Sequence, residues 1–559
     1  MMPDRAEKSN KNNKNLRTMR RLFTYFAVMV ASATLLVGCF GGDYTSAIPE
    51  DAISVLRFDA NQVLEKSGSK KECMDAFRAE LQKQNMPDFM LAIADDLRNT
   101  GIDVDAPMYT FAKLVDKDKL FVALVAKTYN TSLLKRVIER IGEGDLTPQE
   151  TKEGTLFFDE YDTSAVLGYN DEAVVFGCVV PISGRGKTDA KPYVVKALKS
   201  ALDGDGNDEI VPAYENNDVA VCLHTTPLVD ALKSVLKNDY NADLAKAIAE
   251  LESAKGSRID LAFNFAEGSI DLDMVTTNWP KKLNYELGPC SHQNLKYVPS
   301  NTLAVANLPF DGEKFLVALE KFLNENPMVK QELDKELNRS TSGAMNSTML
   351  MAIANPFLST VKGDVTVALN DISVEAVWDP YYNYYSGGYR EKVTPNLCAV
   401  VPVVNDKIMN TASAYFAFSP DVTRISNNLY SVEVEKGLTA LVGKKDNVLF
   451  ASMPNVLDAV AETATESSWY DAVDGSYSYV VVNIAELLNN ATISKELNKE
   501  IYDELGSAGY EVMQILGLFD YCVATAPTWQ SANMSLVLKN QKENSLKQIV
   551  DKVKGAILK

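Results

Sequence analysis

The feature that most constrains the fold of this chain is an internal repeat, with offsets of 250 to 277 residues between matching segments. The segment IPEDAISVLRFDANQVLEK begins at Ile48, and VPSNTLAVANLPFDGEKFLVALEK begins at Val298. Both read as an apolar residue, a proline, two polar residues, an apolar strand, a turn and a helix. The hairpin AVLGYNDEAVVFG from Ala165 aligns without gaps on ALVGKKDNVLFAS from Ala440. The repeat therefore predicts two tandem homologous modules, at residues 46–286 and 291–559.

The elements inside each module indicate the fold class. Strand pairs separated by polar turns alternate with amphipathic helices, such as those expected at 133–141 and 228–236, where apolar residues recur three and four positions apart. Hairpins with interleaved helices favour a mostly antiparallel sheet with packed helices covering one face. The sequence therefore predicts an α+β fold in each module.

The second module contains a predicted insertion. Strands around Phe111 and Val367 match at an offset of 256 residues, whereas those around Leu120 and Leu397 match at 277. The difference of 21 residues falls between two paired strands and contains the tyrosine-rich segment WDPYYNYYSGGYREK. We therefore expect a Tyr-rich hairpin insertion near residues 371–396.

The inserted tyrosines are candidates for ligand or partner contact. Tyrosine offers a flat apolar face and a hydroxyl group at low entropic cost, which suits a contact surface. A glycan or an envelope protein would fit such a surface, and a loop without a ligand is the alternative. The predicted contact residues are Tyr381, Tyr382, Tyr384, Tyr385, Tyr389, Asp379 and Arg390.

The amino-terminal segment has the layout of a secretory signal. A basic stretch precedes an apolar run at residues 22–37, which is shorter than the ~20 residues that span a bilayer. The run ends in Leu36-Val37-Gly38-Cys39, which resembles the bacterial lipobox. This resemblance implies a signal peptide at residues 1–38, thioether lipidation of Cys39 and a lipidated tether at 39–45. Met1 and Met19 are both candidates for the first translated residue.

The predicted anchor and the charge balance suggest a location. Two or more acyl chains, such as a thioether-linked diacyl group and an added palmitate, would hold Cys39 stably in a lipid bilayer. Phe40 replaces the Asp that commonly retains such lipoproteins at the inner membrane, so we expect the outer membrane, with the periplasmic or external face undecided. Residues 1–38 hold seven basic and two acidic residues, so the remainder is more acidic than the net −19 of the whole chain. Such a charge argues against nucleic acid as a partner.

Metal and cofactor chemistry has little support in the sequence. The six cysteines after Cys39 form no Cys-x-x-Cys pair, and the chain has only two histidines, so we expect no zinc site and no cofactor. The acidic segment DGDGNDE offers Asp203, Asp205 and Asn207 as a calcium candidate. It lacks the glycine and glutamate positions of an EF-hand, which favours an acidic surface turn.

The candidates for catalysis are similarly sparse. Cys222 and His224 are two residues apart on an expected strand, so their side chains share a face, and we expect a structural pair. Two-carboxylate hydrolysis needs no histidine, which keeps a glycan hydrolase as the enzymatic alternative. The sequence favours a non-catalytic binding or scaffolding protein over an enzyme.

Two further segments carry a family resemblance. The opening at residues 49–68, which ends in VLEKSG, and the segment TGIDVDAPMYTF from Thr100 resemble a group of large Bacteroidales lipoproteins defined as a domain of unknown function. The resemblance implies an exported, lipid-anchored protein of the cell envelope. It supplies no catalytic residues.

Overall fold

The computed structural model describes the chain as two compact units. The first comprises Met1–Pro280 and Lys542–Val550, and the second comprises Lys281–Gln541 and Asp551–Lys559. The described residues are 43–68, 70–83, 88–116, 119–142, 145–181, 188–204, 217–238, 248, 251–280, 289–340, 345–379, 388–435, 438–445, 447–452, 463–506 and 508–557.

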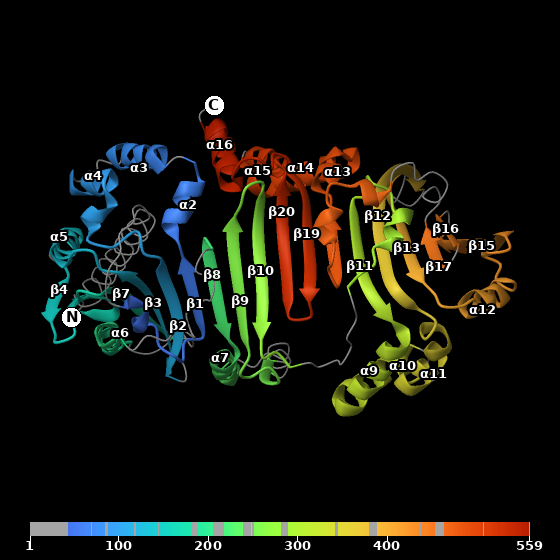
Figure 1. Ribbon diagram of the computed structural model, residues 1–559, viewed down its shortest axis with the longest axis horizontal. Helices are drawn as coiled ribbons and strands as arrows, with labels where there is room; N and C mark the ends of the chain where they lie inside the picture. The colour runs from blue at the N-terminus through green and yellow to red at the C-terminus, as the bar shows by residue number, and fades with distance from the viewer. Residues whose placement is uncertain are drawn as a thin grey trace, which may run out of the picture. The chain divides into compact units, whose positions relative to one another are not determined.

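The first unit is built on an antiparallel sheet (Figure 1). Its described strands are β1 (Ser54–Phe58), β2 (Met108–Asp116), β3 (Lys119–Lys127), β4 (Thr147–Glu150), β5 (Thr155–Asp159), β6 (Asp162–Tyr169), β7 (Ala173–Pro181), β8 (Val219–His224), β9 (Arg258–Phe265) and β10 (Ser269–Thr277). Hydrogen-bonded neighbours give the order β4-β5-β6-β7-β3-β2-β1-β8-β9-β10, with every pair antiparallel.

Helices cover both faces of part of this sheet. They are η1 (Tyr44–Ala47), α2 (Ala60–Lys66), α3 (Lys70–Lys83), α4 (Asp88–Asp95), η2 (Leu97–Thr100), α5 (Thr131–Ile141), α6 (Lys191–Asp203) and α7 (Thr225–Asn238). The segment Lys542–Val550, which leads into α16 (Ser545–Ile557), also belongs to this unit. There Ser545 N donates to Ala266 O at 2.9 Å, and Gly268 N donates to Glu543 O at 2.9 Å.

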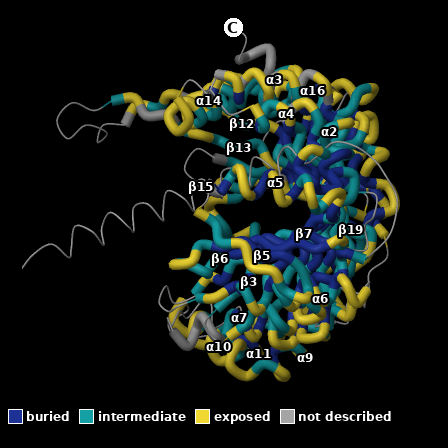
Figure 2. The backbone as a smooth tube through the Cα atoms, turned by 90° about the vertical axis from the view of Figure 1, so that its left-hand side faces the viewer, coloured by how far each residue is buried: buried dark blue, intermediate teal, exposed yellow. Residues whose placement is uncertain are grey.

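Two hydrophobic cores occupy the opposite faces of strands β2, β3 and β7. Phe111, Ala123 and Val175 pack with α6 and η1 on one face, whereas Ala126 and Val174 pack with α4 and α5 on the other. The prediction that helices cover only one face is therefore wrong for this unit. The strands β3 and β7 are nearly continuous apolar runs, which is the pattern of strands buried on both sides. Figure 2 shows the deep burial of β7.

The second unit has its own antiparallel sheet. Its described strands are β11 (Ala304–Asp311), β12 (Lys362–Asp379), β13 (Gly388–Pro402), β14 (Val422–Ser426), β15 (Leu429–Glu435), β16 (Leu438–Lys445), β17 (Val448–Ser452), β18 (Ser478–Val482), β19 (Phe519–Thr528) and β20 (Ser531–Leu538). Their order is β14-β15-β16-β17-β13-β12-β11-β18-β19-β20.

One face of this second sheet carries a buried core. Val305, Ala368, Val481 and Val523 pack there with Trp469, which is 1% exposed. The helices are η3 (Gln293–Tyr297), α9 (Gly312–Glu325), α10 (Pro327–Ser340), α11 (Ser347–Leu358), α12 (Lys407–Phe416), η4 (Ala464–Glu466), η5 (Asp471–Val473), α13 (Ile484–Asn489), α14 (Ala491–Leu505) and α15 (Ala508–Leu516). Residues on the opposite face are partly exposed, among them Leu308, Val367, Leu397, Val480 and Met534.

The strand orders of the two units correspond one to one. β1 lies between β2 and β8 in the first unit, and β11 lies between β12 and β18 in the second. Short helices also precede β1 and β11, and each of these strands leads into a helix whose first turn is capped by an aspartate, Asp59 or Asp311. Two tandem homologous modules remain a prediction from the sequence. Each unit combines helices with an antiparallel sheet, which confirms the α+β class.

The hairpin β12–β13 is much longer than its counterpart β2–β3. Its ladder continues from the pair Asp371 and Asn396 to the pair Asp379 and Gly388. The residues at both ends of the predicted insertion therefore lie in two paired strands and not in a loop. Residues 380–387 lie outside the described residues.

Candidate functional site

The first unit contains a pocket of about 520 Å³ between α6 and the sheet. Its apolar lining includes Ile48, Phe111, Phe121, Tyr193 and Ala197. The Phe121 and Tyr193 rings lie 5.3 Å apart. A concave, mostly apolar site of ~300–1,000 Å³ with a few polar groups is typical of small-molecule binding.

Three separate parts of the chain form the walls of this pocket. Phe111 and Lys113 alternate along β2 on one sheet face, and Phe121 lies opposite Lys113 on β3. The helix α6 contributes Tyr193, Lys196, Ala197 and Ser200, which share a face because they are three, four and seven residues apart. The remaining wall runs from η1 to β1 and contributes Ser46, Ala47, Ile48, Pro49, Glu50 and Asp51.

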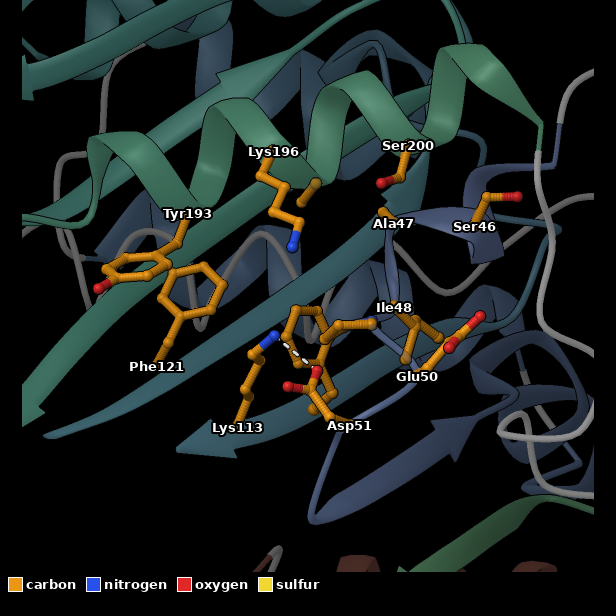
Figure 3. Close-up of a pocket in the computed structure, with 13 residues that line it drawn as sticks. Ser46, Ala47, Ile48, Glu50, Asp51, Lys113, Phe121, Tyr193, Lys196 and Ser200 are labelled. Carbon is orange, nitrogen blue, oxygen red and sulfur yellow. Dashed lines mark ion pairs between the residues drawn. The ribbon is translucent and has the colours of Figure 1, made fainter. Parts of the chain in front are cut away.

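The charged residues of the pocket lining are two lysines, Lys113 and Lys196, and two carboxylates, Glu50 and Asp51. Lys113 Nζ lies 2.5 Å from Asp51 Oδ1. Lys196 extends toward the same region from α6, and the Glu50 carboxylate points away from both ammonium groups (Figure 3). No ion pair joins Lys196 to any described carboxylate. An anion entering the pocket would therefore meet an unpaired ammonium group beside an aromatic floor.

A second cluster in the first unit consists of buried charges at the end of β1. Arg57 Nη2 lies 3.1 Å from Asp59 Oδ2, and Arg57 Nη1 donates to Asn217 O at 2.6 Å. Lys66 Nζ lies 3.0 Å from Asp218, whose side chain is fully buried and accepts from Phe265 N at 2.6 Å. Because each buried charge has an opposite partner, this cluster reads as structural.

The second unit has a polar cluster in the corresponding place, beside the buried Asp364 carboxylate, which accepts from Ser291 Oγ at 2.6 Å. Asn307 is paired with Tyr479 and Thr366 across β18 and β12, and its Oδ1 accepts from Thr366 Oγ1 at 2.7 Å. The His292 ring lies 5.5 Å from the Tyr479 ring. Asn307 Nδ2, Tyr479 OH and both His292 ring nitrogens are buried and lack a hydrogen-bond partner in the described part of the chain.

Cys222 and His224 do meet, with 3.2 Å between Cys222 Sγ and His224 Nε2. Burial, together with the nearby Asp260 carboxylate, raises the pKa of the Cys222 thiol to about 12. Burial also lowers the pKa of His224. A catalytic thiolate–imidazolium pair needs the opposite shifts, so this arrangement holds a neutral pair at neutral pH. The Asp260 carboxylate is held by Arg258, with Nη2 at 2.7 Å from Oδ1.

The other predicted site residues are placed only in part. Cys39, Asp205 and Asn207 lie outside the described residues, as do Tyr381, Tyr382, Tyr384 and Tyr385. Asp203 ends α6 and forms an ion pair with Lys199. Asp379 and Arg390 lie in the β12–β13 ladder. Among the described residues, no three His, Cys, Asp or Glu side chains gather as metal ligands would.

Tyr389 is the described member of the predicted tyrosine set. It faces Trp378 across the β12–β13 ladder, with their rings 5.3 Å apart in an edge-to-face arrangement. Trp378 is 52% exposed and Tyr389 is 67% exposed. The hairpin therefore presents an aromatic pair to solvent.

The residues that line the pocket were not predicted from the sequence. Nothing distinguishes Lys113 and Lys196 among the 56 lysines and arginines of the chain. The one available signal was the one-sided spacing of Tyr193, Lys196 and Ser200 on an amphipathic helix, and that spacing is common to most surface helices.

Five cysteines in the described part of the chain are free thiols. They are Cys178, Cys222, Cys290, Cys398 and Cys522.

Comparisons with known proteins give a family without an activity. Curated proteins yield no match to this chain. A solved structure described as "Structure of crystal form III of TP0453" shares 10% identity over 44% of this chain and 82% of its own, with a TM-score of 0.24. Residues 44–546 match the family described as "Domain of unknown function (DUF4836)". Because that match spans most of this chain, the chain belongs to the DUF4836 family.

Proposed function

We propose that this protein is a lipid-anchored, non-catalytic binding protein of the bacterial cell envelope. Its first unit binds an anionic small molecule that has an apolar body. The Leu-Val-Gly-Cys segment supports anchoring to the outer membrane through acylated Cys39, in the manner of the Bacteroidales lipoproteins that the chain resembles. Among the described residues, no helix is long and apolar enough to cross a membrane.

The observation that carries the ligand class is the unpaired Lys196 above the aromatic floor of the pocket. The floor residues Phe111 and Phe121 are 1% and 2% exposed, so packing holds them in place, and Tyr193 supplies a more accessible aromatic wall. An ammonium group beside a partly desolvated surface attracts an anion more strongly than one in bulk water. A molecule with an apolar ring or chain and a carboxylate or sulfonate would satisfy both features.

A matched pair of fluorescent probes tests this ligand class. The probes are 8-anilinonaphthalene-1-sulfonate and the uncharged N-phenyl-1-naphthylamine, which share an aromatic body. Lys196→Gln should weaken sulfonate binding about tenfold and leave the neutral probe unchanged, because a charge-assisted contact contributes ~1.5–3 kcal/mol. Lys199→Gln on the same helix is the control, since Lys199 pairs with Asp203 outside the pocket. Equal losses in the two variants would contradict the proposal.

The anchor is tested separately from the pocket. Cys39→Ala should release the exported protein from the membrane fraction into the soluble fraction, because acyl chains supply the attachment. Persistent sedimentation of the variant with membranes would refute lipid anchoring. It would leave the pocket experiment unaffected.

A second candidate function is glycan contact by the β12–β13 hairpin. The exposed Trp378–Tyr389 pair favours it, because aromatic faces stack on apolar C–H surfaces while the hydroxyl and indole groups form hydrogen bonds. Replacing both residues by alanine should abolish retention on a glycan array. Tyr161→Ala is a matched control, since Tyr161 is an 80% exposed tyrosine of the first unit. Retention that survives the double replacement would exclude this function.

A further inference from the structure

Helices α9, α10 and α11 of the second unit expose an unusual amount of apolar surface. Six large apolar side chains there are more than a third exposed, namely Val317, Met328, Val329, Met349, Leu350 and Ile353. No residue of α10 is buried. Much of this helical layer is coloured as exposed in Figure 2. Contiguous exposed apolar surface on a folded protein commonly marks an interaction site.

This surface contains a groove between α9 and α11 with a volume of about 400 Å³. Leu316, Val317 and Leu323 line it from α9, and Met351 and Ala352 line it from α11. The lining of α9 extends from residue 313 to residue 324, which is about 16 Å at 1.5 Å per residue. A groove of this length accommodates about three turns of a docked helix.

The charges in the groove indicate the sign of its partner. Glu313 and Glu320 line the groove from α9, and each lies about one helical turn from an apolar residue of the lining. Neither carboxylate is in an ion pair with another described residue. Lys330, the basic residue of the lining, lies 3.3 Å from Asn324 Oδ1. The lining therefore has two carboxylates against one ammonium group, a net negative charge that complements a cationic partner.

The first unit shows which kind of element covers a helical layer of this type. Its α3 and α4 occupy the corresponding place in the chain, after β1, but their Leu81, Met90 and Ile93 are buried. They share a core with the amphipathic helix α5, through Leu134 and Ile138. The opposite side of α5 is basic and carries Lys135, Arg136 and Arg140.

We propose that the groove between α9 and α11 binds a basic amphipathic α-helix of a partner protein. The apolar side of that helix packs against Val317 and Met351, and its lysine or arginine side chains reach Glu313 and Glu320. The flexible Met351 side chain in the lining can adapt to partner side chains of different shape. This site is in the other unit from the anion pocket and does not depend on it.

The test uses the full chain carrying Cys39→Ala and a fluorescein-labelled peptide of 14 residues. The peptide contains only leucine and lysine, with leucine at helical i, i+3, i+4 and i+7 spacing, and its control has the same composition in scrambled order. The amphipathic peptide should bind and the scrambled one should not, as measured by fluorescence anisotropy. Equal binding of the two peptides would overturn the proposal, because it would show attraction by net charge alone.

Charge reversal locates the site. The double variant Glu313→Lys, Glu320→Lys should bind the amphipathic peptide about tenfold or more weakly, because both rim contacts become repulsive. Glu325→Lys is the matched control on the same helix, since Glu325 pairs with Lys321 at 3.8 Å and is not part of the lining. Unchanged affinity in the double variant, or an equal loss in the control, would contradict the assignment.

A membrane is the competing occupant of this apolar surface. The variant Val317→Ser changes a residue of the groove lining that is 65% exposed, so the fold should be preserved, which circular dichroism checks. It should lose the peptide, with no change in sedimentation with phosphatidylglycerol vesicles. Loss of vesicle binding without loss of the peptide would overturn the proposal and assign the surface to lipid.

Discussion

The two units share one strand order but differ in what they bury. In the first unit, β3 and β7 are apolar on both sides, and helices cover both faces of that part of the sheet. In the second unit, β13, which corresponds to β3, and its neighbour β12 alternate instead: Ala368 and Val400 are buried, whereas Val367 and Leu397 on the opposite face are 46% and 41% exposed. The same strand order therefore occurs with a sheet region that is covered on both faces and with one whose second face is partly exposed.

The difference extends to the centre of each sheet. Arg57 on β1 and Asn307 on β11 follow buried valines at matching register positions. Arg57 is paired with a carboxylate, whereas Asn307 belongs to a polar cluster in which Asn307 Nδ2 and Tyr479 OH lack hydrogen-bond partners among the described residues. The common fold therefore accepts either an ion pair or a neutral side chain at this position. Binding sites are therefore to be sought where the units differ.

The largest predicted effect concerns this buried pair of positions. Arg57→Ala should cost about 3–5 kcal/mol of unfolding free energy, because it leaves the Asp59 carboxylate buried without its partner. Asn307→Ala should cost about 1–3 kcal/mol, because only a neutral hydrogen bond with Thr366 is lost. Hydrogen–deuterium exchange within each unit would measure both losses. Equal costs would show that the two centres are energetically alike.

A second prediction compares the first helical residues after β1 and β11. Alanine occupies this position at Ala60, whereas Gly312 occupies it in the second unit. A Cβ added to Gly312 would lie 1.7 Å from the Leu358 carbonyl oxygen, so Gly312→Ala must push α9 away from α11. The expected cost is about 1–3 kcal/mol by denaturant unfolding. The reverse change, Ala60→Gly, should cost about 1 kcal/mol or less.

A smaller effect is expected from pH. Burial lowers the pKa of His224 below its usual 6.5, so the unfolded chain binds more protons than the folded one as pH falls. The first unit should therefore lose stability below about pH 6.5, by at most about 1.4 kcal/mol per pH unit. His224→Asn copies Asn483, the matching residue after β18, and should flatten this slope in unfolding curves from pH 7 to 5. An unchanged slope would assign the pH dependence to other groups.

The smallest predicted difference is between two buried thiols. Burial raises the pKa of Cys222 and of Cys290 to about 12, although one lies beside a histidine and the other beside polar groups of the second unit. At pH 8 about one thiol in ten thousand is ionised, so both should resist iodoacetamide until the protein unfolds. Mass spectrometry of labelled peptides measures the rates. Labelling of either cysteine at the rate of an exposed thiol would contradict this common protection.

The sequence by itself determined the local structure and its repetition. The alternation in the AVLGYNDEAVVFG and ALVGKKDNVLFAS segments predicted two hairpins, and the structure pairs β6 with β7 and β16 with β17. The difference of 21 residues between two repeat offsets located the lengthened β12–β13 hairpin. These features are readable because strand and helix periodicities repeat every 2 and 3.6 residues and involve near neighbours in the chain.

Only the tertiary structure decided which residues meet. The anion pocket combines residues 46–51 with Phe121 and Lys196, and the α9–α11 groove brings Val317 beside Met351. The protonation of Cys222 likewise depends on burial between strands β1 and β9. No periodic pattern records such distant neighbours, because packing and desolvation arise only when elements far apart in the sequence come together.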